Sequence, residues 1–385
     1  MSSPRPRGER DRTLSLAAVG AALSAMFIVR SDTTAGMGLK FLLSKLVYST
    51  SDGAILFLLA FAAICLTVPR KEPPKAVQGA ATRLFWGGAL AGYFPSVGGD
   101  RMPDAALAAA LDDCLDREHV NIQAHVAGRS TQTNEIGRCA VLWPLLAQVA
   151  ADTGARPLAL MDFGCSAGLN LGVDHYRYRH GDVACGAPEE VGTPEVDCHP
   201  VHGRRPPACP APRIDSRLGV DPTPVDVHDE AALRWLRACL WPHDRARMRR
   251  FDQAADIVRG AGWPVRQAPD AYAAIEPWLD TLDAGVQPVV FNSWVLAYFE
   301  PEARAAHVAA MRALVQRRGI AWLSAEGPGL LLGPAPAVLP SDGMVSADEL
   351  ANATLWWLTL PGAAGAARTT LRARSHPHGR WAHWE

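Results

Sequence analysis

The second half of the chain alternates short apolar runs with longer helix-forming segments, and this pattern restricts the fold most. The strand-like runs are 157–163, 264–270, 287–294 and 319–326. The helix-forming segments between and beside them are 230–260, 271–282 and 302–319. Strands separated by helices of this size are joined by right-handed crossovers. The pattern therefore predicts a parallel sheet with helices on both faces.

The end of the sequence departs from this alternation. Strand-like residues at 354–360 and 369–384 are separated by a turn rich in glycine and alanine rather than by a helix, which is typical of an antiparallel pair. We therefore expect an α/β fold, with a doubly wound, mostly parallel sheet of Rossmann-like type, a C-terminal antiparallel hairpin and an N-terminal helical region.

The first part of the chain holds two apolar runs, at 13–29 and 53–68. Both are shorter than the roughly 20 residues that span a bilayer. The first run follows a basic stretch, in the order that signal sequences have. We expect buried helices here, and the alternative is membrane association through these two runs.

Three regions follow from these patterns. Residues 1–76 form an apolar helical segment that ends in a linker rich in proline and charge, 77–156 form a helical cap region, and 157–385 form the sheet domain. Within the sheet domain, residues 180–215 are crowded with proline and glycine. We expect these residues to form a loop inserted between the first two strands.

Charge and cysteine usage limit the classes of function. Lys+Arg 38 against Asp+Glu 39 gives a formal net charge of -1, so no overall basic surface favours nucleic-acid binding. The 8 cysteines lack the regular spacing of a disulfide framework in this 385-residue chain. We expect a cytoplasmic protein with a small-molecule partner.

The stretch LALMDFGCSAGLNL, residues 158–171, has the form of a strand, a glycine-rich turn and the start of a helix. In a doubly wound sheet, ligands bind where such a turn follows the first strand. Its pattern, Asp162-x-Gly164-x-x-x-Gly168, allows the backbone to pass close to a ligand, while the acid can face an amine or a ribose hydroxyl. This combination suits a nucleoside that carries a cationic amino acid better than it suits a pyrophosphate.

This turn resembles the first motif of S-adenosylmethionine-dependent methyltransferases. The resemblance implies that S-adenosylmethionine is the cofactor. It implies a ribose contact at Asp221, which lies farther from Gly168 than is usual in those enzymes, and an adenine contact at Asp270. The cofactor-binding residues expected in full are Asp162, Gly164, Ser166, Gly168, Asn170, Asp221 and Asp270.

Longer motifs resemble a bacterial family known as domain of unknown function 2332. They are YFPSVGGD, TQTNEIGRCAVLWPLL, FGCSAGLNL, WLRACLWP, VVFNSWVLAYF and WLSAEG. The resemblance covers most of the chain from about Tyr93 onward and leaves the segment before residue 77 unassigned. The family implies no established activity.

A polar segment at 129–138 stands among apolar residues and precedes a helix. If that helix covers the cofactor cleft, its polar groups can orient the substrate or the cofactor's amino-acid end. The alternative is simple helix capping by Thr133 or Asn134. The substrate-binding residues expected are Gln132, Asn134, Arg138 and Ser293.

Methyl transfer needs alignment of the acceptor more than covalent catalysis, because the sulfonium is already reactive. By resemblance, the end of the fourth strand, with Asn292 and Ser293, lies at the face where the methyl group is transferred. The residues we expect to position the acceptor, as candidate catalytic groups, are Glu135, Asn292 and Glu326. A binding or sensor protein that keeps the same fold without turnover is the alternative.

Two other kinds of chemistry compete with this hypothesis. Residues 164–168 also spell G-x-S-x-G, the elbow of serine hydrolases, with Ser166 as nucleophile. A later acid and histidine are available at Asp342 and at His376, His378 or His383. However, the helical segments upstream leave no room for the strands that precede such an elbow.

Zinc is the second alternative. Its preferred ligand types occur at Cys185, Cys198, His199, His202 and Cys209. Their spacing lacks a tight C-x-x-C pair, so we expect no bound metal.

Overall fold

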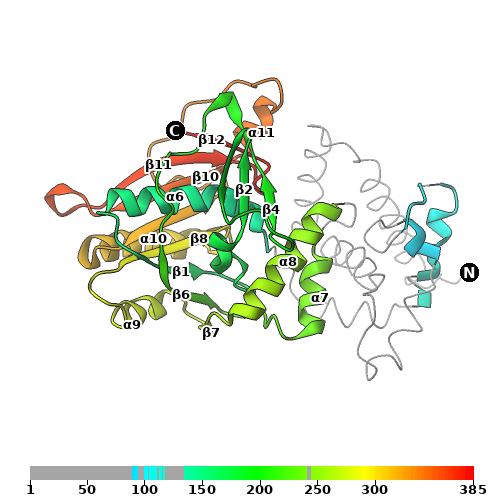
Figure 1. Ribbon diagram of the computed structural model, residues 1–385, viewed down its shortest axis with the longest axis horizontal. Helices are drawn as coiled ribbons and strands as arrows, with labels where there is room; N and C mark the ends of the chain where they lie inside the picture. Colours follow the sequence, from blue (N-terminus) through cyan, green and yellow to red (C-terminus); the bar gives the residue numbers. More distant parts are fainter. Residues whose placement is uncertain are drawn as a thin grey trace, which may run out of the picture. The chain divides into compact units, whose positions relative to one another are not determined.

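The computed structural model describes residues 134–240 and 244–385, together with the shorter stretches 89–93, 99–102, 104–110, 112–114 and 116–117 (Figure 1). The chain divides into two compact units, and the sheet belongs to the unit made of residues 134–233 and 249–385. The apolar runs 13–29 and 53–68 and the site residue Gln132 lie outside the described residues. Where the chain is described, no helix is both long and apolar enough to cross a membrane.

Residues 134–385 contain a nine-stranded sheet with the order β5-β12-β11-β10-β9-β8-β1-β6-β7. Five adjacent strands are parallel to one another: β1 (Leu158–Phe163), β6 (Ile214–Asp221), β7 (Val265–Gln267), β8 (Gln287–Ser293) and β9 (Ala321–Glu326). All six residues of β1 are buried, as expected for a strand covered on both faces. These strands include each of the four predicted from apolar runs, so the expected fold class is confirmed.

The other half of the sheet is mainly antiparallel. β10 (Thr354–Leu360) runs antiparallel to β9, β11 (Arg368–Ser375) runs antiparallel to β10, and β12 (Trp381–Trp384) runs antiparallel to β11. The short strand β5 (His199–Pro200) pairs in parallel with β12 and forms the edge. The predicted C-terminal hairpin is therefore present as the last part of a larger antiparallel meander.

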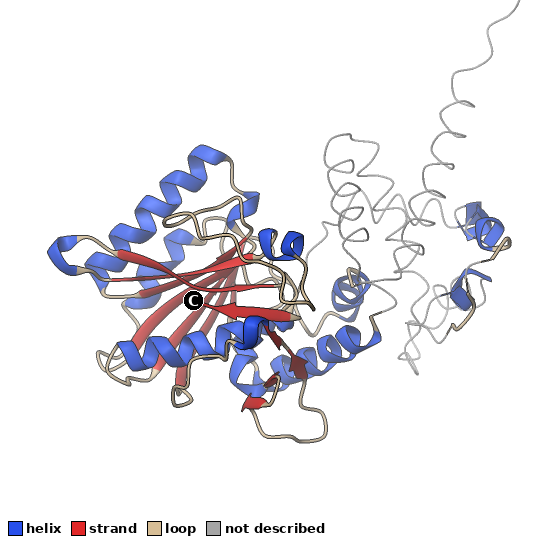
Figure 2. Ribbon diagram, turned by 90° about the horizontal axis from the view of Figure 1, so that it is seen from above, coloured by secondary structure: helices blue, strands red, loops and turns tan. Residues whose placement is uncertain are grey.

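Helices cover both sides of the strands (Figure 2). Ala159, Met161 and Phe163 of β1 share a hydrophobic core with residues of α9 (Ile275–Leu279) and α10 (Pro301–Arg318). Because side chains alternate along a strand, Asp162 points to the opposite face. The other α-helices of the described residues are α6 (Cys139–Asp152), α7 (Glu230–Ala238), α8 (Arg245–Ala261) and α11 (Ala347–Ala351). The described 3-10 segments are η1 (Ala89–Tyr93), η3 (Ile136–Arg138), η4 (Leu169–His175), η5 (Val201–Gly203), η6 (Tyr272–Ala274), η7 (Leu296–Tyr298) and η8 (Ala363–Gly365).

Residues 180–215 are more ordered than the loop expected from their composition. They contain β3 (Val183–Gly186), β4 (Glu195–Asp197) and β5, and β3 and β4 pair with β2 (Arg177–His180) in a small separate sheet. Proline and glycine are common in this segment, yet they fall mostly between these strands, where they do not interrupt pairing. The expectation of a plain loop was therefore wrong.

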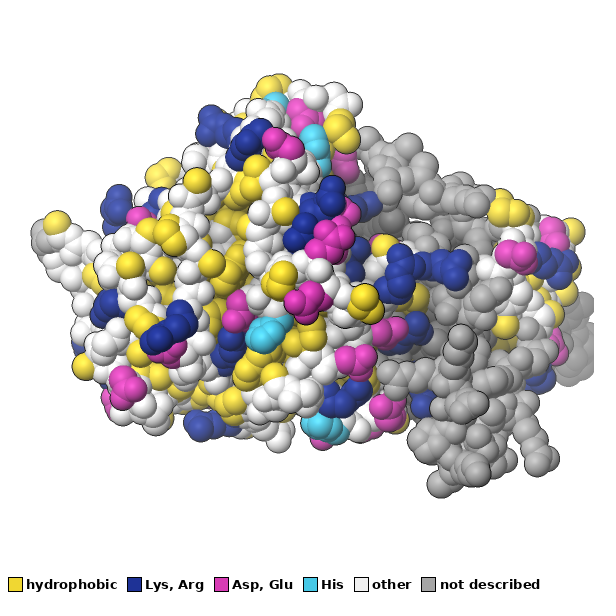
Figure 3. Space-filling view, viewed as in Figure 1, with side chains coloured by type: hydrophobic (Ala, Val, Ile, Leu, Met, Phe, Trp, Pro, Cys, Tyr) yellow, Lys and Arg dark blue, Asp and Glu magenta, His cyan; other side chains and the backbone are white. Residues whose placement is uncertain are grey.

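Basic and acidic side chains are interspersed on the face of the molecule seen in Figure 3. This distribution matches the near balance of 38 basic and 39 acidic residues in the whole sequence.

Candidate functional site

The candidate site lies at the carboxyl ends of β1 and β8. These strands are neighbours, but the chain passes from β1 to β6 and β7 on one side and from β8 to β9 on the other. The strand order therefore reverses between them, and such a switch point is where doubly wound sheets bind their ligands. Two non-glycine residues with left-handed backbones flank it, Ser166 at φ +52° and Trp294 at φ +56°.

The turn after β1 is held close to β6. The Gly164 and Cys165 N–H groups donate to the Val220 carbonyl oxygen at 2.8 and 3.2 Å. Gly164 has φ +80°, and a Cβ there would overlap the side chain of Val295. Both constraints require glycine at this position.

Asp221, the predicted ribose acid, ends β6 beside this turn. One of its carboxylate oxygens accepts the Ser166 N–H at 2.8 Å, and the other accepts the Thr223 N–H at 2.8 Å. Asp221 therefore stabilises the turn through these hydrogen bonds, and the Ser166 N–H is not available to a phosphate. Each carboxylate oxygen can accept a second hydrogen bond, so a ribose hydroxyl still fits chemically.

Asp162, at the end of β1, is only 1% exposed. Its pKa is raised to about 7: burial raises it most, a hydrogen bond from Asn170 and the charge of Arg138 lower it, and the nearby Asp221 carboxylate raises it. The Oδ2 atom of Asp162 has no hydrogen-bond partner among the residues that the structure describes. A buried acceptor of this kind is unfavourable unless a ligand satisfies it.

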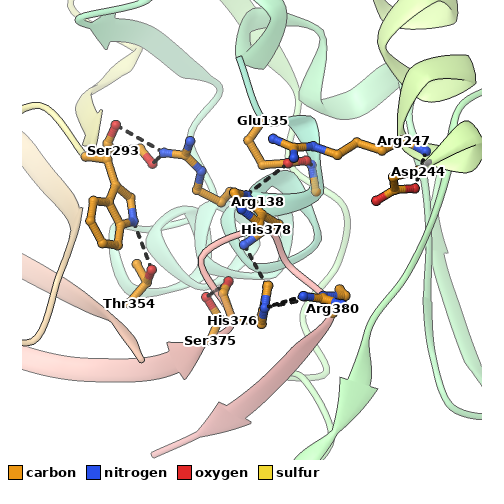
Figure 4. Close-up of polar contacts among 12 residues, drawn as sticks. Glu135, Arg138, Asp244, Arg247, Ser293, Thr354, Ser375, His376, His378 and Arg380 are labelled. Atoms are coloured by element: carbon orange, nitrogen blue, oxygen red, sulfur yellow. Dashed lines mark hydrogen bonds and ion pairs between the residues drawn. The ribbon is translucent and has the colours of Figure 1, made fainter. Parts of the chain in front are cut away.

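The polar segment before α6 joins the two sides of the switch point. The Asn134 amide donates to Ser166 Oγ at 2.9 Å and accepts the Ala167 N–H at 3.3 Å. The Arg138 guanidinium donates to the carbonyl oxygen of Ser293 at 3.2 Å and also to its hydroxyl (Figure 4). Asn134 does not cap the helix, because Glu135 takes that position in η3. The predicted substrate residues Asn134, Arg138 and Ser293 are thus brought together.

Glu135 contacts a residue that the sequence did not connect with it. Its Oε1 accepts the Gly137 N–H at 2.7 Å, and its Oε2 lies 3.2 Å from Nδ1 of His378, in the β11–β12 turn (Figure 4). The backbones of Gly137 and Gly379 approach so closely that a Cβ on either would overlap the other segment. This pair of glycines is the only sequence signal that could have indicated the contact.

Asn292 and Glu326 form a buried network at the ends of β8 and β9. The Asn292 amide donates to Ser324 Oγ at 3.0 Å and to Glu326 Oε1 at 2.8 Å, and its oxygen accepts the Trp322 indole N–H at 2.7 Å. Both N–H groups of this amide and its oxygen therefore have hydrogen-bond partners within the protein. In this arrangement Asn292 orients Glu326 and is not itself turned to a ligand.

Glu326 is fully buried. Its Oε1 also accepts the backbone N–H groups of Val295 and Leu296, at 3.0 and 3.1 Å. Burial raises its pKa, while these N–H donors, Asn292 and the charge of Arg138 lower it. Its Oε2 has no hydrogen-bond partner within the described part of the chain.

Asp270, the expected adenine contact, lies beyond β7 and two strands away from Asp162. It is exposed, and its Oδ1 accepts the Tyr272 and Ala273 N–H groups at 3.0 and 3.3 Å. Its observed contacts are thus with the first two N–H groups of η6, and the adenine contact stays a prediction.

The groups that a serine hydrolase needs are engaged elsewhere. Asp342 accepts a hydrogen bond from His199 at 3.0 Å, and His378 contacts Glu135. Ser166 Oγ accepts a hydrogen bond from the Asn134 amide. Asp342 and His378 therefore have partners other than those that the serine-hydrolase alternative gives them, and that alternative stays a prediction.

For metals, no group of three or more His, Cys, Asp or Glu side chains gathers as a ligand set within the described part of the chain. His199, one of the suggested zinc ligands, is instead paired with Asp342.

The chain belongs to the family described as "Uncharacterized protein conserved in bacteria (DUF2332)", whose model matches residues 42–384. The match begins within the segment that the motif comparison had left unassigned. No curated protein matches the chain significantly.

Among solved structures, the sugar N-methyltransferase KedS8 from Streptoalloteichus sp. ATCC 53650 is similar over 72% of this chain and 79% of its own. The two are 15% identical, with a TM-score of 0.22. The fold class follows from the strand order described above and not from this similarity.

Proposed function

We propose that this protein is an S-adenosylmethionine-dependent methyltransferase that acts on a small-molecule acceptor. The observation that carries the proposal is Asp162, a buried acid at the switch point whose Oδ2 has no hydrogen-bond partner among the residues that the structure describes and whose pKa is lowered by the charge of Arg138. An ammonium group and a carboxylate are what the amino-acid end of this cofactor presents. Asp162 Oδ2 would accept from the ammonium.

We assign the carboxylate to Arg138, whose guanidinium presents several N–H donors in a geometry that matches a carboxylate. Gly164, Ser166, Gly168 and Asn170 would shape the turn around this end. We assign the ribose to Asp221 and the adenine to Asp270. The cofactor would supply a reactive methyl group, and the chain's own residues would align the acceptor and exclude water.

The chemistry of the turn supports a cationic ligand over a phosphate. Two acids, Asp162 and Asp221, border it, and Asp221 takes the Ser166 N–H that a phosphate would use. A sensor protein would share this binding site and lack transfer of the methyl group. Release of labelled methyl product separates these two possibilities.

Calorimetric titration of the full-length protein with S-adenosylhomocysteine tests the proposal. We expect micromolar binding that weakens at least about tenfold in Asp162→Asn, because the amide cannot balance the ammonium charge. Asp280→Asn, which changes an exposed acid paired with Arg318, is the matched control and should bind normally.

The affinity should also depend on pH. The ammonium requires ionised Asp162, whose pKa is about 7, so affinity should rise about tenfold per unit up to that pH and then level off. Asp162→Asn should lose this dependence. Normal binding by Asp162→Asn would place the cofactor elsewhere, and no binding by folded wild-type protein would remove the proposal.

A further inference from the structure

Two buried acids, each with one oxygen that has no hydrogen-bond partner in the described part of the chain, lie on either side of the switch point. Asp162 is the last residue but one of β1, Glu326 is the last residue of β9, and β8 lies between these strands. Asp162 is level with Phe291 of β8 and through it with Leu323 of β9, so Glu326 lies three residues further toward the carboxyl edge of the sheet than Asp162. The charge of Arg138 lowers the pKa of both carboxyl groups.

The orientation of Glu326 is strongly determined. Three donors converge on Oε1: the Asn292 amide and the N–H groups of Val295 and Leu296. A carboxylate oxygen with three donors has no capacity for a ligand. Oε2 is then the atom of this side chain that a ligand can use, and it lacks a partner among the described residues.

We propose that the methyl acceptor is an amine and that Glu326 Oε2 holds its nitrogen. This inference rests on the proposed function and specifies its substrate class. If the ammonium of the cofactor binds at Asp162, then Glu326, two strands away on the β8 side, lies on the side expected for the acceptor.

The charges of the described residues favour an amine over an oxygen nucleophile. Asp162 and Glu326 are both acids, and Arg138, whose charge lowers the pKa of both, donates to Ser293. Such surroundings disfavour a phenolate or carboxylate nucleophile, because like charges repel at short range. They stabilise a product that gains positive charge.

Transfer to an amine has this charge balance. The lone pair of a neutral amine nitrogen forms the bond to the methyl carbon, the carbon–sulfur bond breaks, and its electron pair stays on sulfur. The positive charge moves from sulfur to nitrogen. One N–H of the new ammonium donates to Glu326 Oε2, and the proton then passes to that carboxylate or to water.

Sinefungin provides the test. In this analogue a carbon bearing an ammonium group replaces the sulfur and its methyl group, so its cation faces the acceptor position. We expect calorimetry on the full-length protein to show sinefungin binding about tenfold tighter than S-adenosylhomocysteine, because the ammonium donates to Glu326.

In Glu326→Gln, the side-chain oxygen can still accept the three donors, and an amide NH₂ replaces Oε2. S-adenosylhomocysteine should bind to this variant as it does to wild type, while the preference for sinefungin should fall below about twofold. Glu276→Gln, an exposed acid on α9 paired with Arg317, is the control and should keep the preference.

Equal affinity of the wild-type protein for the two analogues would overturn the inference without using any variant. A preference that persists in Glu326→Gln would overturn it as well. In both cases S-adenosylhomocysteine binds, so the proposed function stands. Failure of both analogues to bind folded protein would instead remove the proposed function, and the acceptor assignment with it.

Discussion

Asp162 and Asp221 occupy equivalent places in the sequence, each an acid at the end of a buried parallel strand, but the protein uses them differently. Asp221 accepts two backbone N–H groups, from Ser166 and Thr223. Asp162 keeps one oxygen without a partner among the described residues, and its pKa is raised to about 7. The difference shows that hydrogen-bond partners, and not position at a strand end, separate an acid that holds the turn from one suited to a ligand.

The largest effect should follow from removing Asp221. In Asp221→Ala the Ser166 and Thr223 N–H groups lose their acceptor, and each hydrogen bond to a charged group contributes about 1.5–3 kcal/mol. We expect the free energy of unfolding in urea to fall by about 3–5 kcal/mol. Asp221→Asn, which keeps one acceptor, should lose about half as much. A loss below about 1 kcal/mol for the alanine variant would show that the turn does not depend on this acid.

Asp162→Asn should differ from Asp221→Ala in both respects. It should bind the cofactor weakly, and its stability relative to the wild-type protein should increase as the pH rises. The pKa of Asp162 rises from 3.8 to about 7 on folding, so the folded state favours the protonated acid. The contribution of Asp162 to the free energy of unfolding is therefore most favourable at low pH and is lost as the pH rises to about 7.

The measurable quantity is the difference in unfolding free energy between wild type and Asp162→Asn. Between pH 5 and pH 8 it should shift by about 2–3 kcal/mol against the wild type. A difference that is independent of pH would mean that Asp162 is ionised in the folded protein without cost, and the contrast with Asp221 would disappear.

Ser166→Gly should have the smallest effect. Glycine relieves the left-handed backbone at φ +52°, but the variant loses the hydroxyl that Asn134 contacts and has a more flexible unfolded chain. These contributions oppose each other, so stability should change by less than about 1 kcal/mol in thermal unfolding. A fluorophosphonate probe should label neither protein. Labelling of wild type that disappears in the variant would revive the serine-hydrolase alternative.

The local part of the site could be predicted from sequence because its residues are consecutive. Asp162, Gly164 and Gly168 belong to one strand and turn, and glycine spacing indicates the backbone conformation directly. The parallel strands were predictable for a similar reason, since each is a short apolar run between helices. These features depend on neighbours within a few residues.

The remaining part depends on contacts between distant segments. Asp221 lies beyond an insertion that forms its own small sheet, so its distance from Gly168 in sequence concealed its contact with Ser166. The pairing of Glu135 with His378 depends on how the β11–β12 turn packs on η3. The hydrogen bonds of Asn292 could not be foreseen from sequence because its partners, Trp322 and Glu326, lie on a neighbouring strand.

The two ends of the large sheet have a consequence for folding. The edge strands are short: β5 is 2 residues long and β7 is 3. Short edges offer few open backbone groups to another chain, which protects the native protein from aggregation. However, β5 pairs with β12, and Trp381 must find His199 across a long stretch of intervening chain.

Contacts of such large sequence separation close late in folding. Until this pair forms, the four residues of β12 present an open edge. Aggregation during refolding should therefore depend steeply on protein concentration, although the finished molecule is well protected.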